Sequence, residues 1–208
     1  MKRYDHIVFD IDGTLIDTRH AVMHGLQDAV REVTGCEMEI EKLLFSFGIP
    51  GEVALRILGV PNPKEALIVW NRHIRKYWDT IDVFPGIRAT LDRLAESGIA
   101  IGIVTSNTRR EYEVEFCRFD ISRLFAIAVT ADDTALHKPE PEPLIKYMDI
   151  AGAQPGRTLY VGDSVYDMRC ARAAGVDGAL ALWGAINRNV ESVWRAEDPT
   201  ALLDIIGM

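Results

Sequence analysis

The chain combines short, continuous apolar runs with longer stretches in which apolar residues recur every three or four positions. After residue 82 the two patterns alternate, as where the run Ile99-Ala100-Ile101-Gly102-Ile103-Val104 follows a helical stretch. Continuous apolar runs of this length are typical of parallel strands that are buried on both faces, whereas three-to-four spacing indicates amphipathic helices. We therefore expect an α/β fold, a doubly wound parallel sheet with helices on both faces.

The same patterns give approximate bounds for the elements. Strands are predicted at residues 7–9, 99–104, 126–130, 158–161 and 179–182. Helices are predicted at residues 18–33, 39–47, 51–58, 63–78, 85–96, 109–119, 140–150, 165–174, 190–194 and 200–206. Turns at Gly48-Ile49-Pro50 and at residues 59–63 separate the early helices, because Gly and Pro interrupt helical patterns.

Four predicted helices lie between the first strand and the second. A stretch of this length without a strand pattern is too long for the single crossover of a βαβ unit. We therefore predict a helical insertion at residues 17–82, within a core domain formed by residues 1–16 and 83–208. The junctions near Leu15-Ile16-Asp17 and Thr80-Ile81-Asp82 are the expected hinges.

Composition is that of an ordinary folded protein, with 48% hydrophobic and 26% charged residues among 208. The chain has 23 Lys and Arg against 31 Asp and Glu, which gives a formal net charge of −8. A negative long-range field repels polyanions, so we expect neither a nucleic acid nor a membrane as partner. An anionic substrate would need local cations.

Three cysteines, Cys36, Cys117 and Cys170, are too few and too scattered for a disulfide framework or a zinc site. The first residues do not have the pattern of a signal peptide, and no segment reaches ~18 uninterrupted apolar residues. We therefore predict a cytoplasmic protein. Either a monomer or a homodimer is compatible with the sequence.

Polar residues follow the predicted strands at the points where they end. They are Asp10 and Asp12 after the first strand, Thr105, Ser106 and Asn107 after the second, Lys138 in the loop after the third, and Asp163 and Asp167 after the fourth. The carboxyl ends of parallel strands share one edge of a sheet, so these residues are expected to converge. Together they offer oxygen ligands for Mg²⁺, a nucleophile and donors to phosphoryl oxygens, the components of phosphoryl transfer.

Each of these residues also has a purely structural interpretation. Asp-x-Asp-Gly is an ordinary way to close a strand, Thr105 and Ser164 are common helix caps, and most lysines lie on solvated surface. Asp10 and Asp12 repel each other, however, and both remain ionised near neutral pH only when a cation or an array of donors lies between them.

Four motifs in sequence order resemble those of the haloacid dehalogenase superfamily. They are Asp10-Ile11-Asp12-Gly13-Thr14-Leu15, the apolar strand ending in Thr105, Lys138-Pro139-Glu140-Pro141, and Gly162-Asp163-Ser164-Val165-Tyr166-Asp167 followed by Ala171 and Ala174-Gly175. The resemblance covers essentially the whole core. The insertion resembles the small helical cap of the branch that contains phosphoglycolate phosphatases, pyrophosphatases and sugar phosphatases.

The resemblance implies a role for each site residue. Asp10 would be the nucleophile that forms an aspartyl-phosphate, and Asp12 the acid and base that serves the leaving group and the water. Lys138 would contact the nucleophile and the phosphoryl oxygens, which Thr105, Ser106 and Asn107 would also bind. Mg²⁺ would be held by Asp10, the backbone carbonyl of Asp12, Asp163 and Asp167.

The implied activity is hydrolysis of a small phosphorylated metabolite, a phosphomonoester that resembles phosphoglycolate or a sugar phosphate. Phosphoglycolate phosphatases commonly have Thr-Asn-Lys where this chain has Thr105-Ser106-Asn107, so the substrate itself is not transferred. A sugar phosphomutase and a non-catalytic binding or regulatory protein remain as alternatives. Ordinary helix-face or core roles are expected for other polar and aromatic residues, namely His20, His24, Arg56, His73, Arg109, Trp70, Tyr77 and Trp78.

Overall fold

The computed structural model describes residues 3–47 and 51–208 of the chain. The turn expected at Gly48-Ile49-Pro50 therefore lies outside the described residues. The chain divides into two compact units, the first formed by Met1–Ile16 with Val83–Met208 and the second by Asp17–Asp82.

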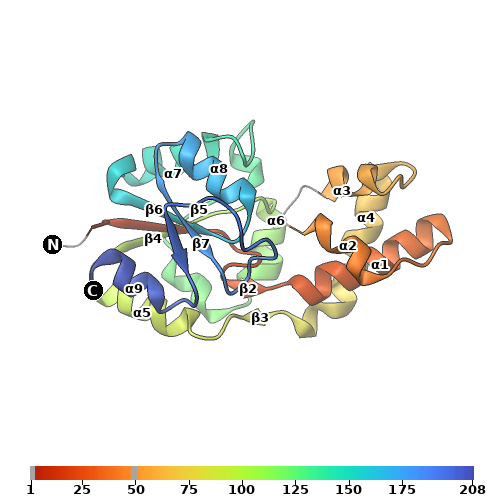
Figure 1. Cartoon of the computed structure of the whole chain (residues 1–208), viewed down its shortest axis with the longest axis horizontal. Coiled ribbons are helices and arrows are strands. Elements are labelled where there is room, and N and C mark those ends of the chain that lie inside the picture. The colour runs from red at the N-terminus through yellow and green to blue at the C-terminus, as the bar shows by residue number, and fades with distance from the viewer. Residues whose placement is uncertain (1–2, 48–50) are drawn as a thin grey trace. The chain divides into compact units, whose positions relative to one another are not determined.

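A six-stranded parallel sheet is the centre of the first unit, with strand order β5-β4-β1-β6-β7-β8 (Figure 1). The strands are β1 (His6–Phe9), β4 (Ala100–Val104), β5 (Ile127–Val129), β6 (Thr158–Gly162), β7 (Asp177–Ala181) and β8 (Trp194–Ala196). Strand β1 pairs with β4 on one side and with β6 on the other. The predicted doubly wound parallel sheet is confirmed, and the strand order reverses at β1, where such sheets carry their sites.

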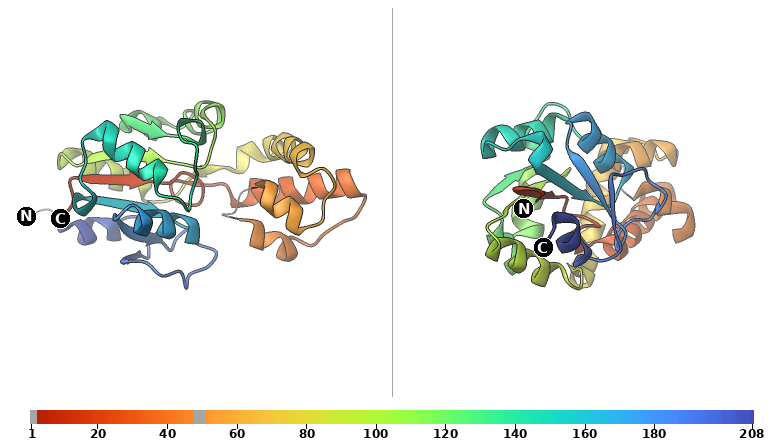
Figure 2. Two further views of the ribbon diagram at one scale, coloured as in Figure 1. Left: turned by 90° about the horizontal axis from the view of Figure 1, so that it is seen from above. Right: turned by 60° about the vertical axis from the view of Figure 1, so that its left-hand side comes forward.

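Helices cover both faces of this sheet (Figure 2). Those on one face are α7 (Glu142–Ala151) and α8 (Val165–Ala173), and those on the other are α5 (Ile87–Glu96) and α9 (Ala201–Ile206). The helix predicted at residues 109–119 is broken: α6 (Arg109–Glu111) passes into a π-helical turn at Tyr112–Phe116. Short 3₁₀ turns lie at Asp120–Leu124, Ala131–Asp133 and Pro155–Arg157.

The central strands are buried because nearly every residue in them is apolar. All five residues of β6 are buried, and Tyr160 packs in one cluster with Val8, Val104 and Leu144. In β4 a glycine is required at Gly102, since a Cβ there would lie 2.0 Å from the ring of Tyr147 in α7. The apolar runs that predicted the strands thus also form the core against α7 and α8.

The helix predicted at residues 190–194 is wrong. Trp194 begins strand β8, where it pairs with Ala179, and its indole donates to the Tyr4 hydroxyl at 2.8 Å. Val190 packs in a cluster with Leu180 and Leu182. The spacing of Val190, Val193 and Trp194 suggested a helix, but the chain here is extended, with Val190 buried by tertiary contacts and Val193 exposed.

The second unit consists of helices. They are α1 (Arg19–Thr34), α2 (Ile40–Leu43) with a 3₁₀ turn at Leu44–Ser46, α3 (Gly51–Ile57), and α4 (Pro63–Ile74) with a 3₁₀ turn at Arg75–Thr80. Their buried faces form a separate core that includes Leu26, Val30 and Leu55. Trp70 lies in this core, as expected, and its indole donates to the Val22 carbonyl at 3.0 Å.

Two very short strands lie where the chain passes between the units. Strands β2 (Ile16–Asp17) and β3 (Asp82–Val83) form a two-stranded sheet, which the sequence did not indicate. That these crossings act as hinges stays a prediction. Among the described helices, none combines the length and apolar character needed to cross a bilayer.

Candidate active site

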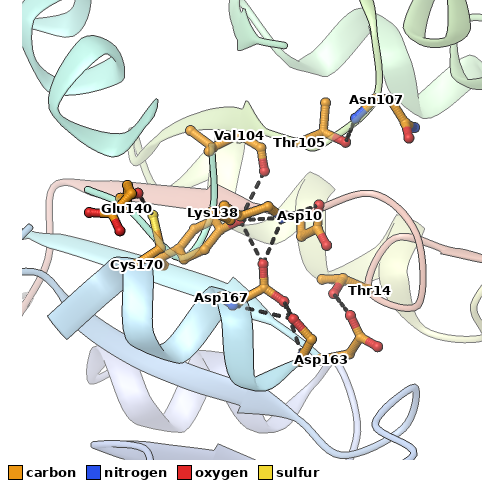
Figure 3. A network of polar contacts seen from close by, with 12 residues as sticks. Asp10, Thr14, Val104, Thr105, Asn107, Lys138, Glu140, Asp163, Asp167 and Cys170 are labelled. Atoms are coloured by element: carbon orange, nitrogen blue, oxygen red, sulfur yellow. Dashed lines mark hydrogen bonds and ion pairs between the residues drawn. The ribbon is translucent and has the colours of Figure 1, made fainter. Parts of the chain in front are cut away.

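Three carboxylates converge beyond the carboxyl ends of β1 and β6 (Figure 3). Asp10 follows β1, Asp163 follows β6, and Asp167 lies in the first turn of α8. Because β1 and β6 are neighbours, with Asp10 N donating to Val161 O at 2.9 Å, the two strand ends are side by side. One oxygen of each carboxylate lies within 4.8 Å of the other two, and all three residues are buried.

Lys138 supplies a cation to this cluster from the loop after β5. Its ammonium lies 2.9 Å from Asp10 Oδ1 and 2.7 Å from Asp167 Oδ1, and it donates to the Tyr160 hydroxyl at 3.2 Å. The side chain is only 5% exposed. The structure therefore brings Lys138 together with Asp10, Asp163 and Asp167, as the sequence predicted.

Asp167 has two sets of partners. Its Oδ1 faces Lys138, while its Oδ2 accepts from Ser164 N at 3.0 Å and from the Ser164 hydroxyl at 2.5 Å. The Ser164 hydroxyl in turn accepts from Asp167 N, which completes a capping box at the start of α8. The structural interpretation of Ser164 as a helix cap is thus confirmed, and it holds Asp167 in the cluster.

Burial makes negative charge costly in this cluster. Burial raises the pKa of Asp10 to about 7, against an opposing effect of Lys138 and with further increases from Asp167 and Asp12. The pKa of Asp163 is raised well above its ordinary range by burial, Asp167 and Asp10. Burial alone would lower the pKa of Lys138, but Asp10 and Asp167 outweigh it and raise the pKa. One ammonium therefore does not compensate the carboxylates.

This donor set fits a divalent metal ion. Three buried carboxylates within reach of one point are hard oxygen ligands, and the raised pKa values of Asp10 and Asp163 mark a place where an added cation would be stabilising. Asp12 is half-buried and is not part of this group of three, although its charge contributes to the raised pKa of Asp10. The predicted use of the Asp12 carbonyl as a ligand stays a prediction.

A tight turn at Gly13 and Thr14 packs directly on Asp163. Gly13 has a φ of +76°, and a Cβ at this position would lie 2.5 Å from Asp163 Oδ2. The Thr14 hydroxyl is 3.5 Å from Asp163 Oδ1. From the loop after β7, the Trp183 indole donates to Thr14 O at 2.9 Å, and a Cβ on Gly184 would lie 1.6 Å from Gly13 O. These contacts of Trp183 and Gly184 were not predicted.

The segment after β4 forms its own turn. Thr105 is buried, and its hydroxyl accepts from Asn107 N at 3.1 Å. Ser106 is exposed and Asn107 is half-buried. Figure 3 shows Thr105 and Asn107 beyond the end of β4, next to Val104. Their predicted contact with a phosphoryl group stays a prediction.

Tyr160 is a member of the cluster that the sequence did not reveal. Its hydroxyl lies 3.2 Å from Lys138 Nζ, 3.0 Å from Asp167 Oδ1 and 2.9 Å from Val104 O. A tyrosine in an otherwise apolar strand is the available signal, because a buried hydroxyl needs a partner. That signal does not say where the partner lies.

The other polar candidates have partners within their own units. Arg109 donates to Asp133 Oδ2 at 2.6 Å and to Ala128 O at 3.2 Å. His73 Nε2 is 2.8 Å from Glu32 Oε2, and Arg56 lies 3.1 Å from Glu52. His20 and His24 lie ring to ring with centroids 4.2 Å apart, and His20 is 3.3 Å from the Thr80 hydroxyl. Tyr77 is 3.1 Å from Asp28 Oδ2.

Comparison with known families assigns the class. The sequence profile described as "Haloacid dehalogenase-like hydrolase" matches residues 7–181, a range that includes every residue of the cluster, and the chain belongs to this family. The resemblance stated from the motifs is thereby confirmed.

Particular relatives are similar over most of the chain. A pyrophosphatase PpaX of Oceanobacillus iheyensis is 29% identical over 184 residues, covering 88% of this chain and 86% of that protein. A phosphoglycolate phosphatase of Aquifex aeolicus is 28% identical over 208 residues, covering 95% and 96%. A crystal structure from Lactobacillus plantarum, provisionally described as a phosphoglycolate phosphatase, has a TM-score of 0.90 at 29% identity and covers 99% of this chain and 100% of that one.

Proposed function

We propose that this protein is a Mg²⁺-dependent phosphatase that hydrolyses a small phosphomonoester through an aspartyl-phosphate on Asp10. The observation that carries the proposal is the buried group of Asp10, Asp163 and Asp167 around Lys138. Membership of the haloacid dehalogenase-like hydrolases supports it, as do relatives named as pyrophosphatase and phosphoglycolate phosphatase.

Two displacements at phosphorus complete the proposed reaction. An oxygen of Asp10 forms a bond to phosphorus while the bond from phosphorus to the leaving oxygen breaks, and the acid form of Asp12 gives its proton to that oxygen. Water then attacks phosphorus, its proton passes to the Asp12 carboxylate, and the bond between phosphorus and Asp10 breaks. Phosphate is released, and Asp10 and Asp12 return to their initial forms.

Asp10, Asp163 and Asp167 would hold the metal, with the Asp12 carbonyl as a further oxygen donor. A bound divalent cation would favour the ionised form of Asp10 and offset the charge of the phosphoryl oxygens. The proposed reaction needs this cation because the pKa of Asp10 is raised, and a protonated carboxyl group is a poor nucleophile.

Lys138 would hold Asp10 in place and balance its charge. All three donors of its ammonium already have protein acceptors, on Asp10, Asp167 and Tyr160. A contact with a phosphoryl oxygen would therefore replace one of these three, whereas Thr105, Ser106 and Asn107 offer donors to that oxygen from the end of β4.

Residues 17–82 would form the cap that selects the substrate, while residues 1–16 and 83–208 carry the chemistry. A mobile cap that excludes bulk water is a common device in hydrolysis of this kind. Substrates of the class that we propose are two- and three-carbon phosphates and sugar phosphates, with pyrophosphate included because of the named relatives.

The proposal is tested with a substrate panel. Phosphate release from two- and three-carbon phosphates, sugar phosphates, nucleotides, pyrophosphate and p-nitrophenyl phosphate is measured with Mg²⁺ and with a chelator. We expect turnover of at least one substrate, lost with the chelator and reduced at least ~10³-fold in Asp10→Asn, which lacks the nucleophile. Asp92→Asn, the same change on helix α5, is the matched control and should keep wild-type turnover.

Three outcomes contradict the proposal. Normal turnover by Asp10→Asn removes the nucleophile assignment. A folded wild-type protein that hydrolyses no member of the panel favours a binding or regulatory role. Conversion of a sugar phosphate into its isomer without phosphate release identifies a phosphomutase.

A further inference from the structure

We propose that Tyr160 is a positioning residue, whose hydroxyl fixes the Lys138 ammonium against Asp10 and ties it to the end of strand β4. None of the four motifs that resemble the haloacid dehalogenase superfamily includes Tyr160. The expected effect on kcat rests on the proposed function. The expected effect on the position of Lys138 can be tested in a protein without activity.

The hydroxyl connects three parts of the site. Tyr160 belongs to β6, Val104 is the last residue of β4, and Asp10 follows β1, the strand that lies between them. Its oxygen is 2.9 Å from Val104 O, the carbonyl that precedes Thr105. It is also 3.2 Å from Lys138 Nζ. Tyr160 therefore reaches across the end of β1, the strand that precedes Asp10. Its hydroxyl joins Lys138 to the end of β4, where Thr105 is expected to bind the phosphoryl group.

The Tyr160 hydroxyl completes the set of hydrogen-bond acceptors around the Lys138 ammonium. The Lys138 ammonium has three donors, and Asp10, Asp167 and Tyr160 are its three acceptors. The single Tyr160 proton is then available to Val104 O or to Asp167 Oδ1, at 2.9 Å and 3.0 Å. Without the hydroxyl, one N–H of a buried cation loses its acceptor, which is unfavourable in a site with so little access to water.

Another buried tyrosine provides a matched comparison. Tyr147 of α7 is 1% exposed, and its hydroxyl is 3.3 Å from His6 Nδ1. Its partner His6 begins strand β1, whereas Asp10 follows the end of that strand. Replacing either tyrosine by Phe removes one buried hydroxyl, but only Tyr160→Phe removes a partner of Lys138.

The kinetic test compares Tyr160→Phe with Tyr147→Phe in the full-length protein with Mg²⁺ and p-nitrophenyl phosphate. We expect Tyr160→Phe to lower kcat by about 10- to 100-fold with KM changed less than about threefold, because a misplaced nucleophile slows chemistry more than it weakens binding. Tyr147→Phe should keep the wild-type kcat. An unchanged kcat in Tyr160→Phe, or an equal loss in both variants, overturns the kinetic part.

The structural test uses crystals of the wild type and both variants. We expect the distance from Lys138 Nζ to Asp10 Oδ1, 2.9 Å here, to lengthen by more than about 0.5 Å in Tyr160→Phe alone. An unmoved ammonium overturns the positioning role. If the wild type hydrolyses no phosphomonoester, the proposed function fails, yet this measurement still decides the role of Tyr160.

A measurement on the wild type covers the case of a variant that does not fold. NMR of protein labelled with ¹⁵N-lysine should show slowly exchanging Lys138 ammonium protons with a nuclear Overhauser effect to the Tyr160 ring. Fast exchange without that effect overturns the proposal.

Discussion

Charged residues gather in both units, but the two groups are balanced differently. In the second unit, Asp28 lies 2.7 Å from Arg31 and 3.3 Å from Lys76, with His73 also within 3.3 Å. In the first unit, Lys138 contacts Asp10 and Asp167, and Asp163 completes the group of three buried carboxylates. Burial raises the pKa of Asp28, but hydrogen bonds from Tyr77 and Lys76 outweigh it and lower the pKa, whereas the pKa of Asp10 is raised.

The difference separates a cluster whose charge the protein itself balances from one that an added cation would balance. Around Asp28, protein cations and donors already stabilise the negative charge, so the cluster links α1 to α4 and needs nothing further. Around Asp10, stabilisation by the protein is incomplete, and an added cation would supply the remainder. The direction in which a carboxyl pKa is shifted therefore distinguishes the two clusters better than the number of charges in each.

The largest effect is expected from removing the cation of each cluster. Lys138→Met leaves two buried carboxylates without their partner and should lower the free energy of unfolding by about 3–5 kcal/mol. Lys76→Met removes a cation that is 54% exposed and should cost less than about 1 kcal/mol. Urea unfolding of both variants measures the difference. Equal losses of unfolding free energy would mean that the cluster around Lys138 depends on its cation no more than the Asp28 cluster depends on Lys76.

Glycines with positive φ offer a second comparison. Gly13 (φ +76°) packs on Asp163, whereas Gly35 (φ +72°), the C-cap of α1, has open space where its Cβ would be. Gly35→Ala should cost about 1–2 kcal/mol through backbone strain alone. Gly13→Ala adds a clash with a carboxylate, so we expect about 2–4 kcal/mol together with loss of phosphatase activity. Thermal unfolding and turnover check both, and an active Gly13→Ala enzyme would contradict the required close approach.

The pH dependence of stability should have opposite signs in the two clusters. The pKa of Asp10 is about 7 in the folded state against 3.8 ordinarily, so the folded protein binds more protons between these values and loses stability as pH rises. Relative to Asp10→Asn, the metal-free wild type should lose on the order of 2 kcal/mol between pH 5 and 8.

For Asp28 the folded pKa is lowered, so its contribution is present above the ordinary value of 3.8 and is lost as pH falls through the folded value. Relative to Asp28→Asn, the wild type should therefore lose stability only on acidification below about pH 4. Urea unfolding across the pH range measures both differences. Parallel profiles for the two variants would remove the distinction between the clusters.

The smallest effect concerns two indoles that donate to backbone carbonyls. Trp183 donates to Thr14 O at 2.9 Å beside the site, and Trp70 to Val22 O at 3.0 Å in the second unit. Loss of one such hydrogen bond costs about 1 kcal/mol, so Trp183→Phe should be slightly less stable and have a kcat reduced about fivefold. Trp70→Phe should also be less stable but keep its kcat. Steady-state kinetics at saturating substrate distinguishes them.

The sequence predicts much of this architecture because its apolar runs are both local and strong. Parallel strands carry their end residues to one edge of the sheet, so Asp10, Lys138 and Asp163 were expected together before any geometry was known. Strand β8 was missed because its three residues, Trp194–Ala196, carry too little pattern to oppose the helical spacing that precedes them.

Other features depend on contacts that no local pattern records. The contact from Trp183 to Thr14 spans 169 positions and ends on a backbone carbonyl, which every residue possesses. Tyr160 looks like one more buried residue of an apolar strand until its hydroxyl is seen between Lys138 and Val104. The sequence therefore predicted the charged groups and the Ser164 cap, but not Tyr160 or Trp183, neutral residues whose partners are distant along the chain.

The central place of β1 has a consequence for how the chain acquires its structure. His6 pairs with Ala100 and with Thr158, so strand β1 has no neighbour until residue 100 has been made and lacks its second neighbour until residue 158 has been made. Helices α1 to α4, by contrast, find all the partners of their own core within residues 17–82. We expect the helical unit to fold early during synthesis and the sheet to close late, so that Asp10 meets Lys138 only after β4 and β5 have been made.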